Sequence, residues 1–327
     1  MELVYLVILS LFLLYLAQII SKKFKLFDVP DEIKIHNEKI PNIAGLALIP
    51  YVLFMFYFFD YSQMISKTLN LFLIVIIIGL IDDLKNINPQ TKILALLIPI
   101  YIFTRDVGEV ETLGIYGSNE LSLGSLSLVF SLLCIFLLTN AFNYIDGLDG
   151  LFALNVIITL STLFFLTGSE KNILIPFLIF LTIYFLFNIN FLKIFPKQFL
   201  GNSGSLGFGF LVSSFLIIFT QIENFLHPSI IIWTVAFIVY EFLTINIIRI
   251  KLSKNIFERD LNFIFNLLKN KYSSIKSLII CTIIHLFFCS ISIFIMLYET
   301  YFLSLLLFII IFFIYLFFRL KQQSIGS

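Results

Sequence analysis

Two adjacent carboxylates, Asp82 and Asp83, end an apolar run in the segment GLIDDLKNINPQTK, and Lys85 follows two residues later. Adjacent carboxylates repel each other and raise a pKa unless a cation lies between them. Their hard oxygen atoms suit Mg²⁺, which commonly binds one or two protein carboxylates together with substrate phosphates. The pair is therefore compatible with a Mg²⁺ site, although a solvated helix end would also contain such residues.

A second acidic segment, NAFNYIDGLDGL, contains amides and carboxylates at spacings of three residues. Asn140, Asn143 and Asp146 fall on one helical face if a helix continues that far, and Asp149 follows. The glycine after each Asp permits a tight loop whose backbone amides can approach a ligand closely. A polar turn is the alternative, but the segment has more Asn and Asp than a turn requires, which favours a binding or catalytic site.

Two further segments have compositions that suit phosphate. The segment FLGNSGSLGFG (residues 199–209) places glycines and serines before a predicted helix, where backbone N–H groups could bind phosphate. Small residues also occur where membrane helices pack closely, so close packing is the alternative. The segment RIKLSKNIFERDLNFIFNLLKNKY is basic and amphipathic, and it could bind a lipid phosphate or a nucleotide, or lie on an anionic membrane surface.

The elements that carry these segments are predicted to be membrane-spanning helices. Hydrophobic residues make up 60% of the 327 residues and charged residues 13%, with a mean hydropathy of +1.05. Soluble domains have about 45–50% and about 25%, so a soluble protein is excluded and no nucleic-acid partner is expected. A spanning helix needs about 20 mainly apolar residues. Eleven suitable runs centre near residues 3–20, 43–59, 68–81, 91–104, 125–141, 151–167, 173–188, 205–221, 229–247, 277–297 and 300–318.

The sequence thus predicts an all-α, polytopic membrane protein of about 11 transmembrane helices that forms a single integral membrane domain (1–327). Lys and Arg accumulate on the cytoplasmic side of membrane proteins. An outside N-terminus and an inside C-terminus leave only Lys67, Arg105 and Lys171 outside. This orientation in an inner (plasma) membrane puts all four polar segments on the cytoplasmic side, where loops are expected near 21–42, 82–90, 142–150, 189–204 and 249–276. The stretch 105–124 lies outside, where a small hairpin is expected.

Cysteines and the N-terminal run are interpreted structurally. Cys134, Cys281 and Cys289 lie inside apolar runs without metal-ligand spacing, as small buried hydrophobic residues do. The N-terminal run lacks a basic n-region and a cleavage site, and we interpret it as a first span and not as a signal peptide.

In this order and topology, the polar segments resemble those of the polyprenyl-phosphate N-acetylhexosamine-1-phosphate transferases, the superfamily of MraY and the WecA-type enzymes (glycosyltransferase family 4). The resemblance covers residues 1 to about 270. The opening segment KLFDVPDEIKIHNEKIPNIAGLAL is similar to the family's D-x-P-x-x-R-K-x-H…P…G-G pattern, and IDDLK to its DD motif. NAFNYIDGLDGL is close to N-x-x-N-x-x-D-G-x-D-G-L, which is the most specific match, and GNSGSLGFG resembles G-D-x-G-S. Arg249 and residues 257–268 resemble the loop that ordinarily ends D-R-x-H-x-H-H-x-L.

The resemblance implies a reaction in which a polyprenyl (undecaprenyl) phosphate in the lipid bilayer displaces UMP from a UDP-sugar, with Mg²⁺ bridging the diphosphate. It would begin the synthesis of a cell-envelope glycan. The implied catalytic residues are Asp82, Asp83, Asp146 and Asp149, and the implied Mg²⁺ ligands are Asp82, Asp83 and Asn202. The implied substrate contacts are Lys34, His36, Lys85, Asn140, Asn143, Gly201, Ser203, Gly204, Ser205 and Arg249.

The chain departs from the family pattern at positions that would meet phosphate or metal. Asn202 replaces the Asp of G-D-x-G-S, and the three histidines are Phe263, Phe265 and Asn266. An amide oxygen can still bind a cation, but the site loses one negative charge. Phenylalanine donates no hydrogen bond, and losing one charged contact to a phosphate can cost roughly 1.5–3 kcal/mol.

These departures leave two hypotheses. The first is an active transferase with an altered donor site, which rests on the four intact acids of the DD and DGLDG motifs. The second is a catalytically impaired family member that binds a lipid carrier or nucleotide as a partner or regulator. A transporter is a weaker interpretation, because the acids lie at helix ends and transport sites lie near the middle of the membrane.

Overall fold

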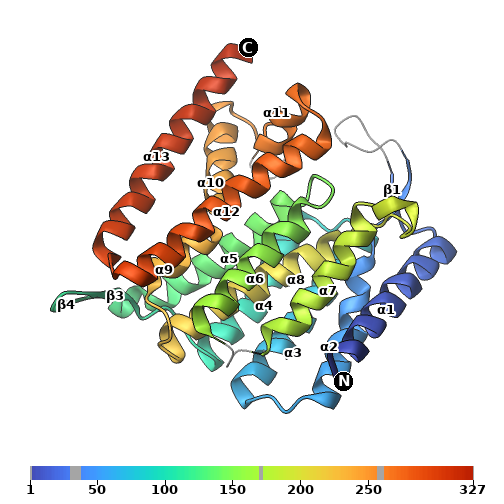
Figure 1. Cartoon of the computed structure of the whole chain (residues 1–327), viewed down its shortest axis with the longest axis horizontal. Helices are drawn as coiled ribbons and strands as arrows, with labels where there is room; N and C mark the ends of the chain where they lie inside the picture. Colours follow the sequence, from blue (N-terminus) through green and yellow to red (C-terminus); the bar gives the residue numbers. More distant parts are fainter. Residues whose placement is uncertain (1, 30–37, 169–171, 256–260, 327) are drawn as a thin grey trace.

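The computed structural model describes residues 2–29, 38–168, 172–255 and 261–326. Within these ranges a helix lies at each of the apolar runs that the sequence predicts to span a membrane (Figure 1). The helices are α1 (Glu2–Phe24), α2 (Leu48–Phe58), α3 (Gln63–Lys85), α4 (Pro89–Asp106), α5 (Ser127–Ile145), α6 (Leu151–Thr167), α7 (Leu174–Asn188), α8 (Gly201–Ile217), α9 (Pro228–Ile231), α10 (Ala236–Lys251), α11 (Ile264–Lys271), α12 (Ser274–Tyr298) and α13 (Tyr301–Gly326). Short 3₁₀ turns lead into α2 (Ala44–Ala47) and join α9 to α10 (Ile232–Val235).

Length and composition allow seven helical segments in the described part of the chain to cross a membrane: Glu2–Phe24, Gln63–Lys85, Gly124–Ile145, Gly201–Ile222, Pro228–Lys251, Ser274–Tyr298 and Tyr301–Gln322. Three shorter apolar helices accompany them: Ala44–Phe58, Leu151–Thr167 and Leu174–Asn188. The all-α, polytopic membrane class is therefore confirmed. The number of spans, the single domain and the orientation stay predictions.

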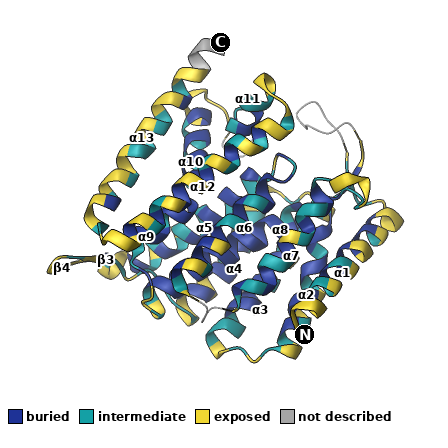
Figure 2. Cartoon of the chain, viewed as in Figure 1, coloured by how far each residue is buried: buried dark blue, intermediate teal, exposed yellow. Residues whose placement is uncertain are grey.

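Helix α8 forms the centre of the bundle. In the apolar stretch of Gly201–Ile222, 89% of the residues are buried inside the bundle. The corresponding share is 39% for α3 and for α5, and both of these helices pack against α8. Figure 2 shows α8 almost entirely in the colour of buried residues. Small residues permit this close packing. A Cβ atom on Gly79 of α3 would lie 2.5 Å from the Asn202 carbonyl oxygen and from Ser203 Cα.

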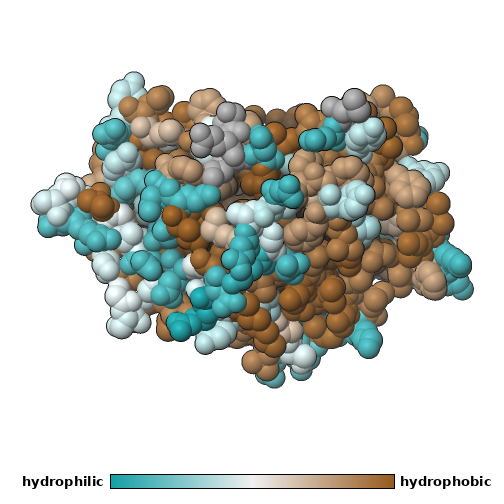
Figure 3. Space-filling model, turned by 90° about the horizontal axis from the view of Figure 1, so that it is seen from below, coloured by the Kyte–Doolittle hydropathy of each residue, from teal (hydrophilic) through white to brown (hydrophobic). Residues whose placement is uncertain are grey.

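The last helix, α13, lies at the periphery. Only 6% of the residues in its apolar stretch, Tyr301–Gln322, are buried, and Figure 2 shows the helix mostly in the colour of exposed residues. Exposed side chains such as Phe302, Phe313 and Phe317 are apolar, as lipid contact requires. Figure 3 shows apolar residues of this kind as a broad surface beside a band of hydrophilic residues.

Two short pairs of strands lie outside the helical bundle. Strands β3 (Thr112–Tyr116) and β4 (Asn119–Ser122) pair antiparallel, which confirms the predicted hairpin. Gln221, beyond α8, anchors it, because its side-chain oxygen accepts from the backbone N–H of Glu111 and of Thr112. Strands β1 (Phe27–Asp28) and β2 (Ile40–Pro41) also pair antiparallel. Phe199 N–H donates to the Pro41 carbonyl, so this pair is tied to the chain that leads into α8.

Replacing Gly79 tests the close contact between α3 and α8. A methyl group there meets backbone atoms of α8, so the Gly79→Ala variant must move the two helices apart. We expect it to lower the free energy of unfolding by about 1–3 kcal/mol, even though Ala favours helix by up to about 1 kcal/mol. Thermal unfolding in detergent measures the change. The control is Ile77→Ala, because Ile77 is 45% exposed on the same helix. Equal unfolding temperatures for the two variants would contradict the close contact.

Candidate active site

The polar segments converge on one cavity of about 580 Å³. It lies where α3, α5 and α10 end and where α4, α8 and α11 begin. The residues singled out in the sequence that line it are Asp82, Asp83, Asn140, Asn143, Asp146, Asp149, Gly201, Asn202, Ser205, Arg249, Phe263, Phe265 and Asn266. Asp28, which ends β1, and Asn42, which follows β2, line it as well. Segments far apart in the sequence therefore form one site.

Three of the predicted substrate contacts do not line this cavity in the described part of the chain. Lys85 is exposed at the end of α3. Ser203 and Gly204 are buried in helix packing, where a Cβ on Gly204 would meet the Leu200 side chain. Ser205 lines the cavity, but Ser203 offers only its backbone N–H to a neighbouring acid. Lys34 and His36 lie outside the described residues.

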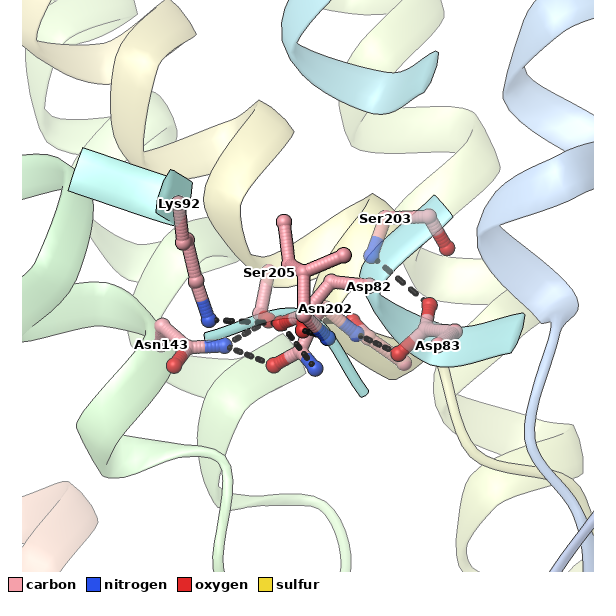
Figure 4. A network of polar contacts seen from close by, with 9 residues as sticks. Asp82, Asp83, Lys92, Asn143, Asn202, Ser203 and Ser205 are labelled. Atoms are coloured by element: carbon pink, nitrogen blue, oxygen red, sulfur yellow. Dashed lines mark hydrogen bonds and ion pairs between the residues drawn. The ribbon is translucent and has the colours of Figure 1, made fainter. Parts of the chain in front are cut away.

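The carboxylate of Asp83 caps the first turn of α8 (Figure 4). Its Oδ1 accepts from the Asn202 backbone N–H at 2.8 Å, and its Oδ2 accepts from the Ser203 backbone N–H at 3.0 Å. An anion is favoured there because the helix start has unpaired N–H groups and a positive dipole end. Gly201 permits the approach, since its φ is +77° and a Cβ on it would lie 2.5 Å from Asp83 Oδ2. Asp83 thus fixes where α8 begins.

The neighbouring acid, Asp82, is the centre of a polar network (Figure 4). Its Oδ2 pairs with Lys92 Nζ at 2.8 Å and accepts from Asn202 Nδ2 at 3.0 Å. Asn143 Nδ2 in turn donates to Asn202 Oδ1 at 2.8 Å and to Ser205 Oγ at 2.7 Å. Residues from α3, α4, α5 and α8 are therefore joined through one buried carboxylate. Sequence reasoning missed Lys92, whose only signal is its place in the first turn after Pro89.

The two acids of the DGLDG segment differ in their partners. Asp149 forms an ion pair with Lys197 at 2.5 Å. Asp146, at the end of α5, has no hydrogen-bond or ion-pair partner in the described ranges of the chain. Burial, together with the negative charges of Asp149, Asp83 and Asp28, raises the pKa of Asp146 to about 7. The cavity therefore contains one carboxylate that would gain from a nearby cation.

Aromatic side chains pack at the positions where the family resemblance expects histidines. The rings of Phe263 and Phe265 stack at 5.2 Å, and both side chains are buried. Arg249 lies over the rings of Tyr144 at 5.1 Å and Phe263 at 5.8 Å. A Cβ on Gly147 would lie 2.5 Å from the Phe265 ring, so this ring lies directly against the DGLDG loop. The two phenylalanines hold α11 against that loop and donate no hydrogen bond to a ligand.

Lysine and arginine side chains, and not histidines, provide the positive charge of the cavity. Lys92, Lys197, Lys269 and Arg249 line it in the part of the chain that the structure describes. Lys197 and Lys269 were also missed in the sequence, because single lysines in basic loops form no pattern. A diphosphate needs such charges, since each charge-assisted hydrogen bond to a phosphate oxygen is about twice as strong as a neutral one.

The residues of the cavity fit a Mg²⁺ ion that takes some of its ligands from the protein and the others from a substrate. Among the described residues, no three His, Cys, Asp or Glu side chains lie together as a preformed metal site. Asp82 is paired with Lys92, and Asp83 accepts from two backbone N–H groups. Asp146 retains a carboxylate without a partner. Because Mg²⁺ commonly takes one or two carboxylates and completes its shell with phosphates and water, Asp146 fits it better than a closed cage would.

Comparison with known proteins gives a consistent result. The family model described as Glycosyl transferase family 4 matches residues 65–220. The chain is 26% identical to the undecaprenyl-phosphate alpha-N-acetylglucosaminyl 1-phosphate transferase of Yersinia pestis over 284 residues, which are 82% of this chain and 76% of the relative. It is 25% identical to the protein of the same name from Escherichia coli K12 over 264 residues, 78% of this chain and 72% of the relative.

A third similar protein comes from Bacillus subtilis strain 168, where it is named probable undecaprenyl-phosphate N-acetylglucosaminyl 1-phosphate transferase. It is 30% identical over 203 residues, which are 59% of this chain and 55% of the relative. The part of this chain that matches the family model, residues 65–220, contains Asp82, Asp83, Asp146, Asp149 and Asn202.

The raised pKa of Asp146 predicts how stability depends on pH. Between about pH 4 and pH 7 the folded chain holds a proton on Asp146 that the unfolded chain has released, so this group makes stability fall as pH rises. The Asp146→Asn variant lacks this penalty. With a chelator present, we expect it to be more stable than the parent chain above pH 7, on the order of 1–3 kcal/mol, because the cavity still admits some water. The difference should vanish below about pH 4.

Thermal unfolding across this pH range measures the effect. The control is Asp106→Asn, since the Asp106 side chain is 52% exposed at the other end of the bundle. Added Mg²⁺ should stabilise the parent chain and leave Asp146→Asn unchanged. A stability difference that does not vary with pH would contradict the assignment to Asp146.

Proposed function

We propose that this chain, of which residues 65–220 match the model of glycosyl transferase family 4, transfers an N-acetylhexosamine-1-phosphate, or a related sugar-1-phosphate, from a UDP-sugar to polyprenyl phosphate with release of UMP. The observation that carries the proposal is the cavity in which the DD, DGLDG and GNSGS segments meet. It combines acids with four basic side chains, which is what a diphosphate and a metal ion require.

In this reaction an oxygen of the polyprenyl phosphate attacks the β-phosphorus of the UDP-sugar. The bond from that phosphorus to the bridging oxygen breaks, and UMP leaves with its electrons. The second pKa of a phosphate monoester is about 6, so the attacking group is mainly a dianion at neutral pH and needs no base. The work of the protein is therefore to bind and orient two anions and to neutralise their charge.

The basic residues divide this work by position. Lys92, held by Asp82 at 2.8 Å, presents its charge at the start of α4, next to Asn202. Arg249 is fixed between the rings of Tyr144 and Phe263 on the α10 side of the cavity. Two cations placed by different helices can bind two phosphate groups in a defined orientation. Lys269 of α11 adds a third charge to the lining.

Mg²⁺ bound in this cavity would neutralise charge that develops on the departing UMP. Asp146 would hold it, and the amide oxygen of Asn202 and the carboxylate of Asp83 are the remaining candidate ligands. Asn202 contributes an oxygen without a charge, so a metal held by these residues would depend strongly on the substrate phosphates.

The placement in the cell is part of the proposal. UDP-sugars are cytoplasmic, and the excess of Lys and Arg in the loops around the cavity favours a cytoplasmic active face of an inner (plasma) membrane. The prenyl chain would lie along the apolar exterior of the bundle while its phosphate enters the cavity. An unpaired carboxylate and four basic side chains favour an active transferase over a protein that only binds carrier or nucleotide.

The direct test uses the purified chain in lipid nanodiscs with undecaprenyl phosphate, Mg²⁺ and each common UDP-N-acetylhexosamine. We expect release of UMP together with a polyprenyl-diphospho-sugar that mass spectrometry identifies. Absence of turnover with every donor would contradict the proposal.

Two lysine variants separate the cavity from its surroundings. Lys92→Met should lower kcat/KM by roughly 10–100-fold, as expected for the loss of one charged phosphate contact. Lys85→Met, at the exposed end of α3, should retain most of the activity, because Lys85 does not line the cavity. Equal losses in the two variants would contradict the assignment of Lys92.

A further inference from the structure

We infer that Glu241 and Arg319 are positioning residues of this active site, through which the last helix, α13, fixes the start of α11. The inference rests on the proposed function and adds to it a part of the chain outside residues 65–220. Glu241 lies on α10 and Arg319 on α13. Figure 1 shows α13 beside α10, with α11 at the same end of the bundle.

The pair is buried and doubly bonded. Arg319 Nη2 lies 3.0 Å from Glu241 Oε1, and Arg319 Nε donates to Glu241 Oε2 at 3.3 Å. The side chains are only 2% and 3% exposed. Tyr315, one turn earlier on α13, donates its hydroxyl to Glu241 Oε2 at 2.5 Å. Arg319 therefore stays charged and fixed in orientation, as a two-pronged guanidinium–carboxylate contact requires.

The same two side chains hold the backbone that leads into α11. Glu241 Oε1 accepts from the Ile264 backbone N–H at 2.6 Å. Arg319 Nη2 donates to the Asn262 carbonyl at 2.5 Å. These contacts hold the backbone on either side of Phe263. The ion pair therefore fixes the position from which the Phe263 side chain reaches the cavity. Among the described residues, none from α13 lines the cavity itself, so Arg319 acts on the site through the chain that leads into α11.

The pair positions Phe263 and Phe265, the two aromatic residues before and within α11 that line the cavity. Phe263 packs on Arg249, a proposed phosphate contact, and Phe265 packs on the DGLDG loop at Gly147. Asn266 and Lys269, on the same short helix, line the cavity. A shift in the start of α11 would therefore move two cations and the support of the acidic loop together.

Stability alone is a poor explanation for this pair. Removing two charges from water costs several kcal/mol per ion, and apolar residues of similar size often stabilise a protein as well or better. Few other residues of α13 are fully buried, since only 6% of the residues in its apolar stretch Tyr301–Gln322 belong to that class. A costly, specific contact at its end is explained by the geometry that it imposes on residues 262–264.

The test is the double variant Glu241→Leu/Arg319→Met, which leaves no unpaired buried charge. Hydrogen–deuterium exchange is measured for the amides of residues 264–271, and UMP release for the whole chain in nanodiscs. We expect exchange of these amides to rise at least about 10-fold and kcat/KM to fall about 10–100-fold, with little change in the unfolding temperature. Arg319→Lys keeps the charge but not the two-pronged geometry, so its values should lie between those of the parent chain and the double variant.

The matched control is Tyr240→Phe. Tyr240 precedes Glu241, and its hydroxyl donates to the Phe308 carbonyl of α13 at 2.6 Å without reaching α11. It should leave exchange of residues 264–271 and turnover unchanged. Unchanged exchange in the double variant would overturn the inference, and so would faster exchange with normal kcat/KM. If the double variant does not fold, Arg319→Lys decides by the same two readouts. A parent chain without UMP release would contradict the proposed function alone, because the exchange measurement still tests whether the pair holds α11.

Discussion

The carboxylate of Asp83 at the first turn of α8 is the contact on which the rest of the site depends. It accepts hydrogen bonds from the backbone N–H groups of Asn202 and Ser203. Gly201 and Gly79 lack a side chain, which lets α3 and α8 approach so closely. Because α8 is the buried centre of the bundle, fixing its start also fixes Asn202 against Asp82 and Asn143. A displacement of α8 would separate the residues of three other helices.

Charge in the cavity follows from this arrangement. Asp82 and Asp149 each pair with a lysine and Asp83 accepts from two backbone N–H groups, whereas Asp146 has no hydrogen-bond or ion-pair partner in the described residues. An acid left without a partner carries a raised pKa, which a cation would lower. The site thus combines fixed cations with one acid available to a ligand. This division of roles suits a reaction in which binding and charge neutralisation provide most of the acceleration.

Much of the fold could be predicted because about 20 apolar residues are enough to specify a spanning helix. The meeting of the acidic segments was also predictable, since they occur at helix ends that the loop charges assign to one side of the membrane. Lys92 was not predictable as the partner of Asp82, because only the tight connection between α3 and α4 brings its side chain back to that acid. Ser203 and Gly204 have the composition of a phosphate loop, yet helix packing buries them. The link between Glu241 and Arg319, 78 residues apart, leaves no local pattern.

Both anions of the proposed reaction would bind in one cavity, and a structure determined with a UDP-N-acetylhexosamine and Mg²⁺ tests this most directly. The predicted result is a diphosphate between Asp146, Lys92 and Arg249, with a cation on Asp146. A nucleotide bound at another surface, or an empty cavity at saturating donor, would contradict the account.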